Sequence, residues 1–175
     1  YTDRVAEPEM TLKVIGYQWY WGYEYPDYEI SEFQAYMIPD ADIDVDAGQK
    51  RLLSTDYPIV LPVDTDIEFL ITAADVLHSF AVPSFGVKTD AVPGRTNVSW
   101  VRITKPGTYY GQCSELCGAN HAYMPIEVRA VPKDVFTRWA EAAKEDLDGS
   151  YALLDQLAPA VEAEEVDAVE AAATE

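Results

Sequence analysis

The pattern of hydrophobic and polar positions predicts a β-sheet protein. Residues 10–25 alternate and are rich in aromatic and β-branched side chains, which is typical of one or two strands around Gly16. Further strand-like runs, bounded by Asp, Pro and Gly turn signals, lie at residues 51–54, 59–62, 67–72, 97–104, 108–112 and 125–130. Residues 84–95 are typical of a turn-rich connection. Many short strands at this spacing indicate an all-β sandwich or barrel.

The pattern changes at Pro132, where a helical period replaces the alternation. Apolar residues at the spacing of one helix face are Val135, Phe136, Trp139, Ala140 and Ala143. We therefore predict an amphipathic helix that lies on the barrel, and the sequence also permits a helical turn around residues 152–157. The rest of the C-terminal part has no periodic apolar face, so we predict an acidic, largely disordered tail. The predicted organisation is a linker at 1–9, the barrel domain at 10–131, the helix at 132–148 and the tail at 149–175.

In two stretches, side chains of the same kind would lie on one side of an extended segment. One face of the first strands would carry Trp19, Trp21, Tyr23 and Tyr25. We predict that at least three of these four rings fill the core. Residues 40–46 would place four Asp side chains on one side and apolar side chains on the other. This arrangement predicts a strongly negative edge on the domain.

Composition and charge narrow the classes of function. The 175 residues are 49% hydrophobic, which is enough for a real core. Much of the formal net charge of −19 comes from residues 145–175, which carry ten acidic residues and no Lys or Arg, but the remaining chain is acidic too. An acidic surface argues against nucleic-acid binding and favours a cationic partner, with solubility as the simpler explanation. No window approaches the ~18 apolar residues of a membrane span, so we expect a soluble chain, processed or trimmed before Tyr1.

The candidate chemistry lies in residues 113–124, which hold both cysteines, one of two histidines and one of three methionines. Thiolate, imidazole and thioether groups form a soft ligand set that suits copper or zinc. A disulfide between Cys113 and Cys117 would leave the histidine and methionine of this loop without a role. A structural zinc ion completed by an upstream histidine would not need the methionine. Free core thiols fit poorly with a loop rich in Gly, Asn and Ser.

Copper would use every soft ligand of this loop. Copper electron-transfer sites take one His from an upstream strand end and Cys, His and Met from a single downstream loop, and His78 with residues 113–124 matches this layout. If both sulfurs bridge two coppers, each copper receives two thiolates and one imidazole. Met124 would complete one copper and a backbone carbonyl of the loop the other. Such a site favours electron transfer over catalysis, because the loop offers no activated water. A mononuclear copper carrier and a structural zinc domain remain the alternatives.

Over residues 10–139 the chain resembles the soluble copper domain of cytochrome c oxidase subunit II. The motifs that carry the resemblance are Gln-Trp-Tyr-Trp at 18–21, Tyr36-Met-Ile-Pro39, Arg51-Leu-Leu, Asp75-Val-Leu-His78-Ser, Ala81-Val-Pro-Ser, the run from Gly86 to Arg95, the run from Tyr109 to His121, and Met124-Pro. The resemblance implies a cupredoxin-like Greek-key β-barrel. It also implies a place on the periplasmic face of a bacterial inner membrane, or the intermembrane-space face in mitochondria. The two transmembrane helices that the family carries ahead of this domain are absent from the sequence.

The resemblance also implies roles for individual residues. A binuclear copper centre would be held by His78, Cys113, the backbone carbonyl of Glu115, Cys117, His121 and Met124. The Glu115 carboxylate would reach a magnesium or manganese site at the interface with the catalytic, haem-bearing subunit. Trp19 would be the electron-entry aromatic at the surface, which conflicts with a core position. Asp75 and Glu24 would dock the lysines of cytochrome c, while residues 40–46 are equally well explained by docking or solvation. The implied function is to accept electrons from reduced cytochrome c and pass them to the haem of the catalytic subunit.

Overall fold

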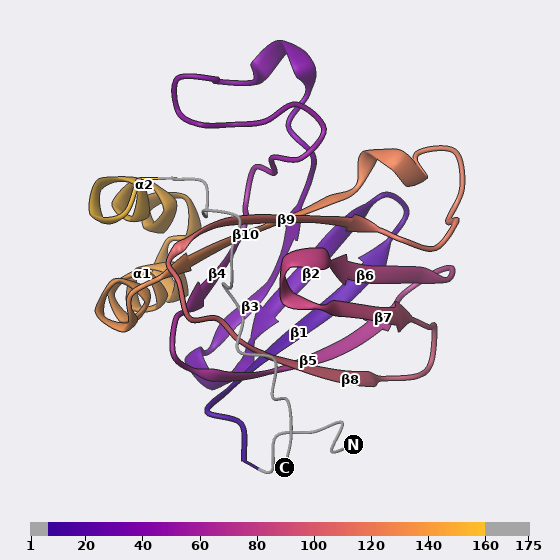
Figure 1. Ribbon diagram of the computed structural model, residues 1–175, viewed down its shortest axis with the longest axis horizontal. Helices are drawn as coiled ribbons and strands as arrows, with labels where there is room; N and C mark the ends of the chain where they lie inside the picture. The colour runs from indigo at the N-terminus through magenta and orange to yellow at the C-terminus, as the bar shows by residue number, and fades with distance from the viewer. Residues whose placement is uncertain (1–6, 160–175) are drawn as a thin grey trace.

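Two five-stranded β-sheets form the body of the protein in the computed structural model, which describes residues 7–159 (Figure 1). The first sheet has the strand order β3-β2-β1-β5-β8 and the second β4-β10-β9-β6-β7. The strands are β1 Met10–Tyr17, β2 Tyr20–Tyr25, β3 Ile30–Ala35, β4 Ile59–Pro62, β5 Asp66–Ala73, β6 His78–Val82, β7 Val87–Ala91, β8 Asn97–Arg102, β9 Gly107–Cys113 and β10 Pro125–Val131. The predicted all-β architecture is confirmed.

The first sheet is built on a hairpin of β1 and β2. Buried and half-buried residues alternate along β1, so one face of the strand points into the core. β1 also pairs in parallel with β5, so β1 is the central strand of the first sheet. Trp21, Tyr23 and Tyr25 are buried, in agreement with the predicted core role for three of the four rings. Trp19 instead lies in the turn between β1 and β2.

The second sheet positions the candidate metal loop. β9 and β10 pair antiparallel, and residues 114–124 connect them. β6 pairs with β9 next to the start of this loop, at Phe80 and Cys113. Every residue of β10 is buried, because this strand lies in the interior of its sheet between β4 and β9. The end of β9, the start of β10 and the start of β6 therefore meet at one end of the barrel.

Strands β3, β6 and β7 add to the predicted set. β7 falls within residues 84–95, which the sequence indicated as a turn-rich connection. A single 3₁₀ turn at Pro83–Phe85, followed by Gly86 with a φ of 64°, reverses the chain so that β7 pairs with β6. Tight turn signals on both sides of a five-residue strand obscured its alternation. Among the described residues, no helix is long and apolar enough to cross a lipid bilayer.

Two helices, α1 Lys133–Glu145 and α2 Leu147–Leu157, end the described part of the chain (Figure 1). α1 lies within the helix predicted at 132–148, and α2 extends into the predicted tail and includes the helical turn that the sequence permitted around 152–157. α1 buries the predicted residues Phe136, Trp139, Ala140 and Ala143. The chain turns at Asp146, whose carboxylate accepts a hydrogen bond from Gly149 N and so caps α2. α2 then buries Tyr151 and Leu154. Gly149 suggested a helix end, but it lies in the first turn of a second helix. Residues 160–175 of the predicted tail and 1–6 of the predicted linker lie outside the described residues.

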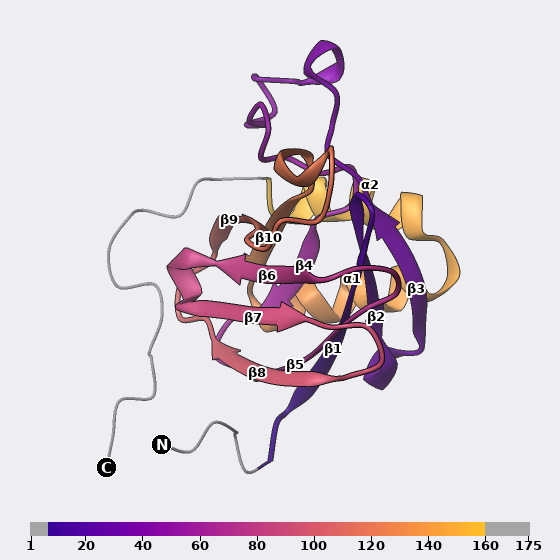
Figure 2. The same cartoon turned by 90° about the vertical axis from the view of Figure 1, so that its right-hand side faces the viewer.

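Residues 36–57, here called the arm, project from the barrel between β3 and β4 (Figures 1 and 2). The predicted strand at 51–54 is wrong, because these residues form turns. The predicted extended segment at 40–46 is also wrong, since it begins with a 3₁₀ turn at Asp40–Asp42 and continues into turns. Asp44 accepts a hydrogen bond from Ala47 N through its carboxylate and from Gln49 N through its carbonyl. Local Asp bonds of this kind favour turns over strands.

Candidate metal centre

The loop between β9 and β10 is anchored at both of its ends. Cys113 N donates a hydrogen bond to Met124 O at 3.3 Å, which brings the first and last ligand positions together. Ser114 N donates to Ser79 O at 2.9 Å and ties the loop to β6. Because His78 is the first residue of β6, this bond also sets the position of the upstream histidine relative to the loop.

The two cysteine sulfurs lie at the centre of the cluster. Their Sγ atoms are 3.8 Å apart, much farther than the ~2.0 Å of a disulfide, and both cysteines are free and buried. Cys113 Sγ lies 3.8 Å from His78 Nδ1, and Cys117 Sγ lies 3.5 Å from His121 Nδ1. Cys117 Sγ also lies 3.5 Å from Met124 Sδ. Each sulfur thus has its own imidazole, and one of them has the thioether.

The sixth predicted donor is a backbone oxygen. Glu115 O lies 3.3 Å from Cys113 Sγ, on the sulfur that lacks the thioether. The carboxylate of the same residue is exposed. The structure therefore brings together all six donors that the resemblance indicated. Two sulfurs, two imidazoles and a thioether fit copper or zinc, whereas magnesium and calcium prefer oxygen ligands.

Burial and hydrogen bonding shift the pKa values of the two cysteine thiols in opposite directions. Burial raises the pKa of Cys113, but hydrogen bonds with His78 and with nearby backbone groups outweigh it and lower this pKa to about 6. Burial and the adjacent charge of Cys113 raise the pKa of Cys117. Burial opposes the charged form of His78, yet its bonds to Cys113 and Asp75 raise its pKa. Metal binding would displace the remaining protons, so the affinity for metal must rise with pH.

Asp75 orients the upstream histidine. Its Oδ1 lies 2.9 Å from His78 Nε2, which leaves Nδ1 directed at Cys113. The carboxylate also accepts hydrogen bonds from Gln18 N at 2.7 Å and Val76 N at 2.6 Å. Burial raises the pKa of Asp75, and these bonds lower it below its usual value overall. The residue predicted to dock a partner therefore also holds the imidazole in place, a role that is common around metal-binding histidines.

Gln18 and Trp19 hold the loop from the opposite side. Gln18 Nε2 and Trp19 Nε1 both donate to Cys117 O, at 2.8 and 3.2 Å. Gly118 adopts a φ of 121°, and a Cβ there would lie 3.0 Å from the Trp19 ring. Trp19 is half-buried and packs on the loop, so it does not fill the core between the sheets. This position agrees with a place between the surface and the sulfur cluster.

Two further residues shape the site in ways that sequence reasoning missed. Trp21 Nε1 donates to Met124 O at 3.3 Å, and its ring centre lies 5.9 Å from that of His78. A Cβ on Gly16 would lie 2.8 Å from the His78 ring, so only glycine leaves room for the imidazole. Both residues, like Gln18, belong to the β1–β2 hairpin, where alternation suggested only strand and core. The Gln-Trp-Tyr-Trp motif at 18–21 was the available signal.

Glu24, the second predicted docking acid, is not part of this cluster. It pairs with Lys13 at 2.8 Å, three register positions along the hairpin from Gly16. Exposed apolar side chains lie beside the ligands instead. Leu77, Leu116 and Tyr123 are at least half exposed, and they immediately precede His78, Cys117 and Met124. The same short segments therefore present ligands inward and apolar groups outward.

Comparison with known proteins gives the family of the chain. The family model of the cytochrome c oxidase subunit II periplasmic domain matches residues 10–131. A probable cytochrome c oxidase subunit 2 of Rickettsia prowazekii is 56% identical over 139 residues, which are 79% of this chain and 44% of that protein. The cytochrome c oxidase subunit 2 of Branchiostoma floridae is 53% identical over 140 residues, 80% of this chain and 60% of that protein. The chain thus spans about half the length of these curated relatives.

Solved structures show the same relationship. The periplasmic domain of cytochrome oxidase subunit II (CoxB) of Bradyrhizobium japonicum is 47% identical, with a TM-score of 0.75 over 81% of this chain and 98% of that domain. A structure of a mixed-disulfide intermediate between a thioredoxin-like protein and subunit II of cytochrome c oxidase is 46% identical, with a TM-score of 0.69 over 81% of this chain and 95% of that one. The predicted cupredoxin-like fold is confirmed by the first of these likenesses. The chain therefore belongs to the family of the periplasmic domain of cytochrome c oxidase subunit II.

Proposed function

We propose that the chain is the electron-accepting domain of a cytochrome c oxidase and that it holds a binuclear copper centre. The observation that carries the proposal is the pair of free sulfurs 3.8 Å apart, each with its own imidazole. A thioether beside Cys117 and a carbonyl oxygen beside Cys113 supply one further donor to each side. When bound, the two coppers would supply a one-electron carrier, with Cys113 and Cys117 as thiolate ligands. A mononuclear site with two histidines, one cysteine and an axial methionine would leave one sulfur unused.

The residues of the chain would hold this carrier in one geometry. Asp75 fixes the ring of His78, while Gln18 and Trp19 fix the backbone at Cys117. Ligands that are held in place by other contacts move little when charge changes, so the environment needs little rearrangement during electron transfer. The half-buried Trp19 would be the entry point, since its indole joins the surface to the carbonyl of a ligand residue.

The partners proposed for this site are reduced cytochrome c as donor and the catalytic, haem-bearing subunit as acceptor. The exposed Leu77, Leu116 and Tyr123 offer an apolar patch beside the ligands, and Asp75 offers a carboxylate that is 34% exposed. Glu24 would contribute less charge to docking, because Lys13 pairs with it. Acidic groups around an apolar centre suit a lysine-rich partner and raise the rate of encounter.

The exposed carboxylate of Glu115 would contribute to a magnesium or manganese site at the interface with the catalytic subunit. Its carbonyl already faces Cys113, so one residue would link the copper site to that interface. We place the domain on the periplasmic face of a bacterial inner membrane, or on the equivalent face in mitochondria, in line with the periplasmic domain family. Membrane attachment would come from helices outside the given sequence.

Copper reconstitution tests the proposal directly. The 175-residue chain should bind two copper ions, and one unpaired electron should couple equally to both nuclei in electron paramagnetic resonance. A single copper per chain would support a mononuclear carrier instead. Stoichiometric zinc that copper cannot displace would support a structural zinc domain. Either of these two results contradicts the binuclear centre.

A further inference from the structure

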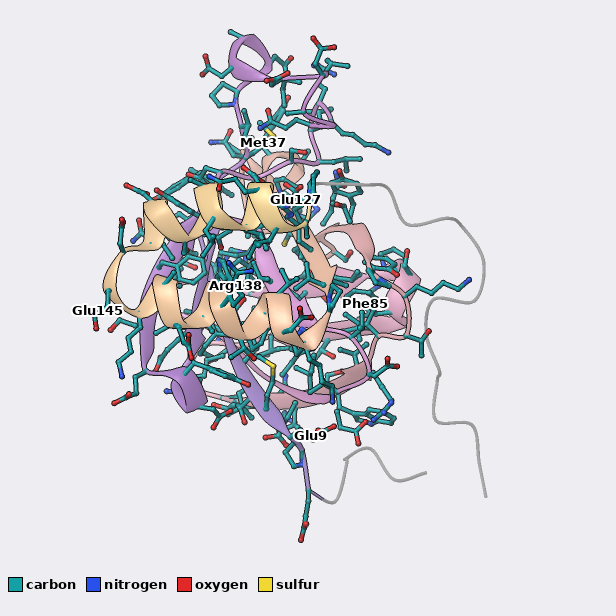
Figure 3. The ribbon with its side chains drawn as sticks, turned by 90° about the vertical axis from the view of Figure 1, so that its left-hand side faces the viewer. Glu9, Met37, Phe85, Glu127, Arg138 and Glu145 are labelled. Atoms are coloured by element: carbon teal, nitrogen blue, oxygen red, sulfur yellow. The ribbon has the colours of Figure 1, made fainter. Side chains whose placement is uncertain are left out.

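A second polar site lies away from the metal centre, at the base of the arm. A pocket of about 270 Å³ opens between the arm, β10 and α2. Figure 3 shows Glu127 at this place, close to α2 and below Met37 at the start of the arm. The pocket is lined by Ala47, Gln49, Thr55, Asp56, Pro58, Glu127, Arg129, Tyr151, Asp155 and Pro159. Its volume is at the small end for ligand pockets, which suits a ligand of only a few heavy atoms.

The pocket is more negative than its single cation can balance. Three carboxylates line it, from Asp56, Glu127 and Asp155, against one guanidinium. Arg129 Nη1 donates to Asp155 Oδ1 at 2.5 Å and Nη2 donates to the carbonyl of Ala158, so this cation is already engaged at the α2 side. Asp56 and Glu127 therefore have no cation of their own among the residues that line the pocket.

Glu127 is unusual in the pocket lining because its ionisable carboxyl group is buried. Glu127 is only 7% exposed, and its Oε2 accepts a hydrogen bond from Thr55 N at 2.7 Å. Burial raises the pKa of Glu127 to about 7, although the bond from Thr55 and the charge of Arg129 act in the opposite direction. Burial also raises the pKa of Asp56. Glu127 is therefore desolvated without full compensation, whereas Asp56 is exposed and its Oδ1 accepts hydrogen bonds from Tyr36 N and Tyr57 N. A bound cation would relieve the cost at Glu127.

Thr55 provides an independent indication that this pocket binds a polar ligand. It is 4% exposed, and its Oγ1 has no hydrogen-bond partner although it lines the pocket beside Glu127. A buried hydroxyl without a partner costs about 1–3 kcal/mol, so such groups usually mark an absent donor or acceptor. Because Thr55 N already binds Glu127, its hydroxyl and that carboxylate are held side by side.

The arrangement fits an organic cation better than a metal ion. Among residues 7–159, the group of three or more His, Cys, Asp or Glu whose ligand atoms lie close enough to hold a metal is His78, Cys113 and Cys117. The pocket carboxylates do not converge in that way. The lining also includes apolar groups, which come from Ala47, Pro58 and the ring of Tyr151. Carboxylates that do not meet at one point, in a pocket with apolar walls, match positive charges joined by methylene groups.

We propose that this pocket binds a short aliphatic diamine in its diammonium form. One ammonium group donates to the Glu127 carboxylate and the Thr55 hydroxyl, and the second lies toward Asp56 with the methylene chain between the apolar walls. The site is separate from the metal centre and does not depend on copper.

Nuclear magnetic resonance of the ¹⁵N-labelled 175-residue chain tests the proposal with 1,4-diaminobutane as the probe. At about pH 8 and low salt, saturable shifts are expected at the Thr55 and Glu127 amides. Glu127→Gln and Thr55→Val should each weaken the apparent affinity about tenfold or more, because each removes one hydrogen-bonding partner of the ammonium group. Glu141→Gln, on the exposed face of α1, removes the same charge and should leave the affinity unchanged.

Further probes separate the diamine from other cations. Butylamine should bind about tenfold more weakly, because it has one ammonium group. Calcium that saturates the same two amides and displaces the diamine would show a metal site and overturn the proposal. Absence of saturable shifts at about 10 mM diamine, a concentration that would reveal even very weak binding, would also overturn it. Equal affinity in Glu127→Gln, or shifts confined to residues 145–175, would indicate general attraction to acidic groups and would contradict it too.

Discussion

The metal loop and the arm are both polar connections between strands, yet their polar groups are held in opposite ways. Bonds to the metal loop come from distant parts of the chain, such as Gln18 to Cys117 and Ser114 to Ser79. Many bonds of the arm join near neighbours, such as Ala47 to Asp44. A loop held by distant segments keeps one geometry, whereas a loop held by its own neighbours mainly offers surface. The predictions below test this difference, from the largest expected effect to the smallest.

Removal of one sulfur should have the largest effect. In Cys117→Ser the hydroxyl is a poor bridging ligand for copper, so the shared-valence signal should disappear and the copper content should fall to at most a single ion. Electron paramagnetic resonance with metal analysis measures both. Ser114→Ala is the matched control, because Ser114 Oγ donates to Gln112 O, which is not one of the six predicted metal donors. An unchanged spectrum in Cys117→Ser would show that Cys117 is not a bridge.

Gly16→Ala should lower the affinity for copper by displacing His78. The new Cβ would lie 2.8 Å from the His78 ring, so the imidazole must move and the copper affinity should fall roughly 10–100-fold. Competition with a chelator measures this affinity. In Gly22→Ala, on the same hairpin, the closest atom to the new Cβ is Oε1 at the end of the exposed Glu32 side chain. Equal losses in both variants would mean that the hairpin as a whole, and not the His78 contact, is responsible.

Trp19→Phe should separate metal binding from electron entry. The variant loses the indole donor to Cys117 O but removes no ligand, so copper content should stay intact while electron uptake from reduced cytochrome c slows sharply. Stopped-flow oxidation of cytochrome c measures this rate. Trp100→Phe, a half-buried tryptophan of β8, should leave it unchanged. Unfolding of Trp19→Phe, seen by circular dichroism, would restore a core role for this ring.

Glu127 at the base of the arm should make stability depend on pH. Its folded pKa of about 7 lies above the ordinary value of 4.5, so the native state binds more protons than the unfolded state between these pH values. The contribution of the protonated group is therefore fully present below about pH 4.5 and is lost as pH rises toward 7. Glu127→Gln should remove this part of the pH dependence and be more stable than the parent chain at about pH 8. A constant difference in unfolding temperature across this range would contradict the assignment.

The smallest effect is expected in the arm. Arg51 pairs with Asp40 at 2.6 Å, but both side chains are more than half exposed. Exposed pairs of this kind contribute little, so Arg51→Ala should change the free energy of unfolding by about 0.5 kcal/mol or less. Chemical denaturation measures this change, with Arg138→Ala on the exposed face of α1 as the control. A loss well above that of the control would mean that the arm is held more strongly than its local contacts indicate.

The sequence alone determined the class of fold and the chemistry of the candidate site. Alternation and turn signals located most strands, because a half-buried strand imposes a period of two on its side chains. The concentration of soft ligands in residues 113–124 was likewise visible, since ligand type follows from side-chain chemistry and not from contacts. Where alternation arose in an exposed segment, as in residues 40–46, the same signal misled because no partner strand was present.

Only the tertiary structure decided how these parts meet. Gly149 reads as a helix end, but burial of Tyr151 and Leu154 against the core continues the chain into α2. The orienting role of Asp75 and the close approach of Gly16 to His78 join residues that are separated by folding, so no local pattern contains them. The pocket at Glu127 depends in the same way on three elements that meet only in the folded chain. The sequence specifies the type of each side chain. The distances between site residues and the desolvation of their polar groups arise only when distant segments pack together.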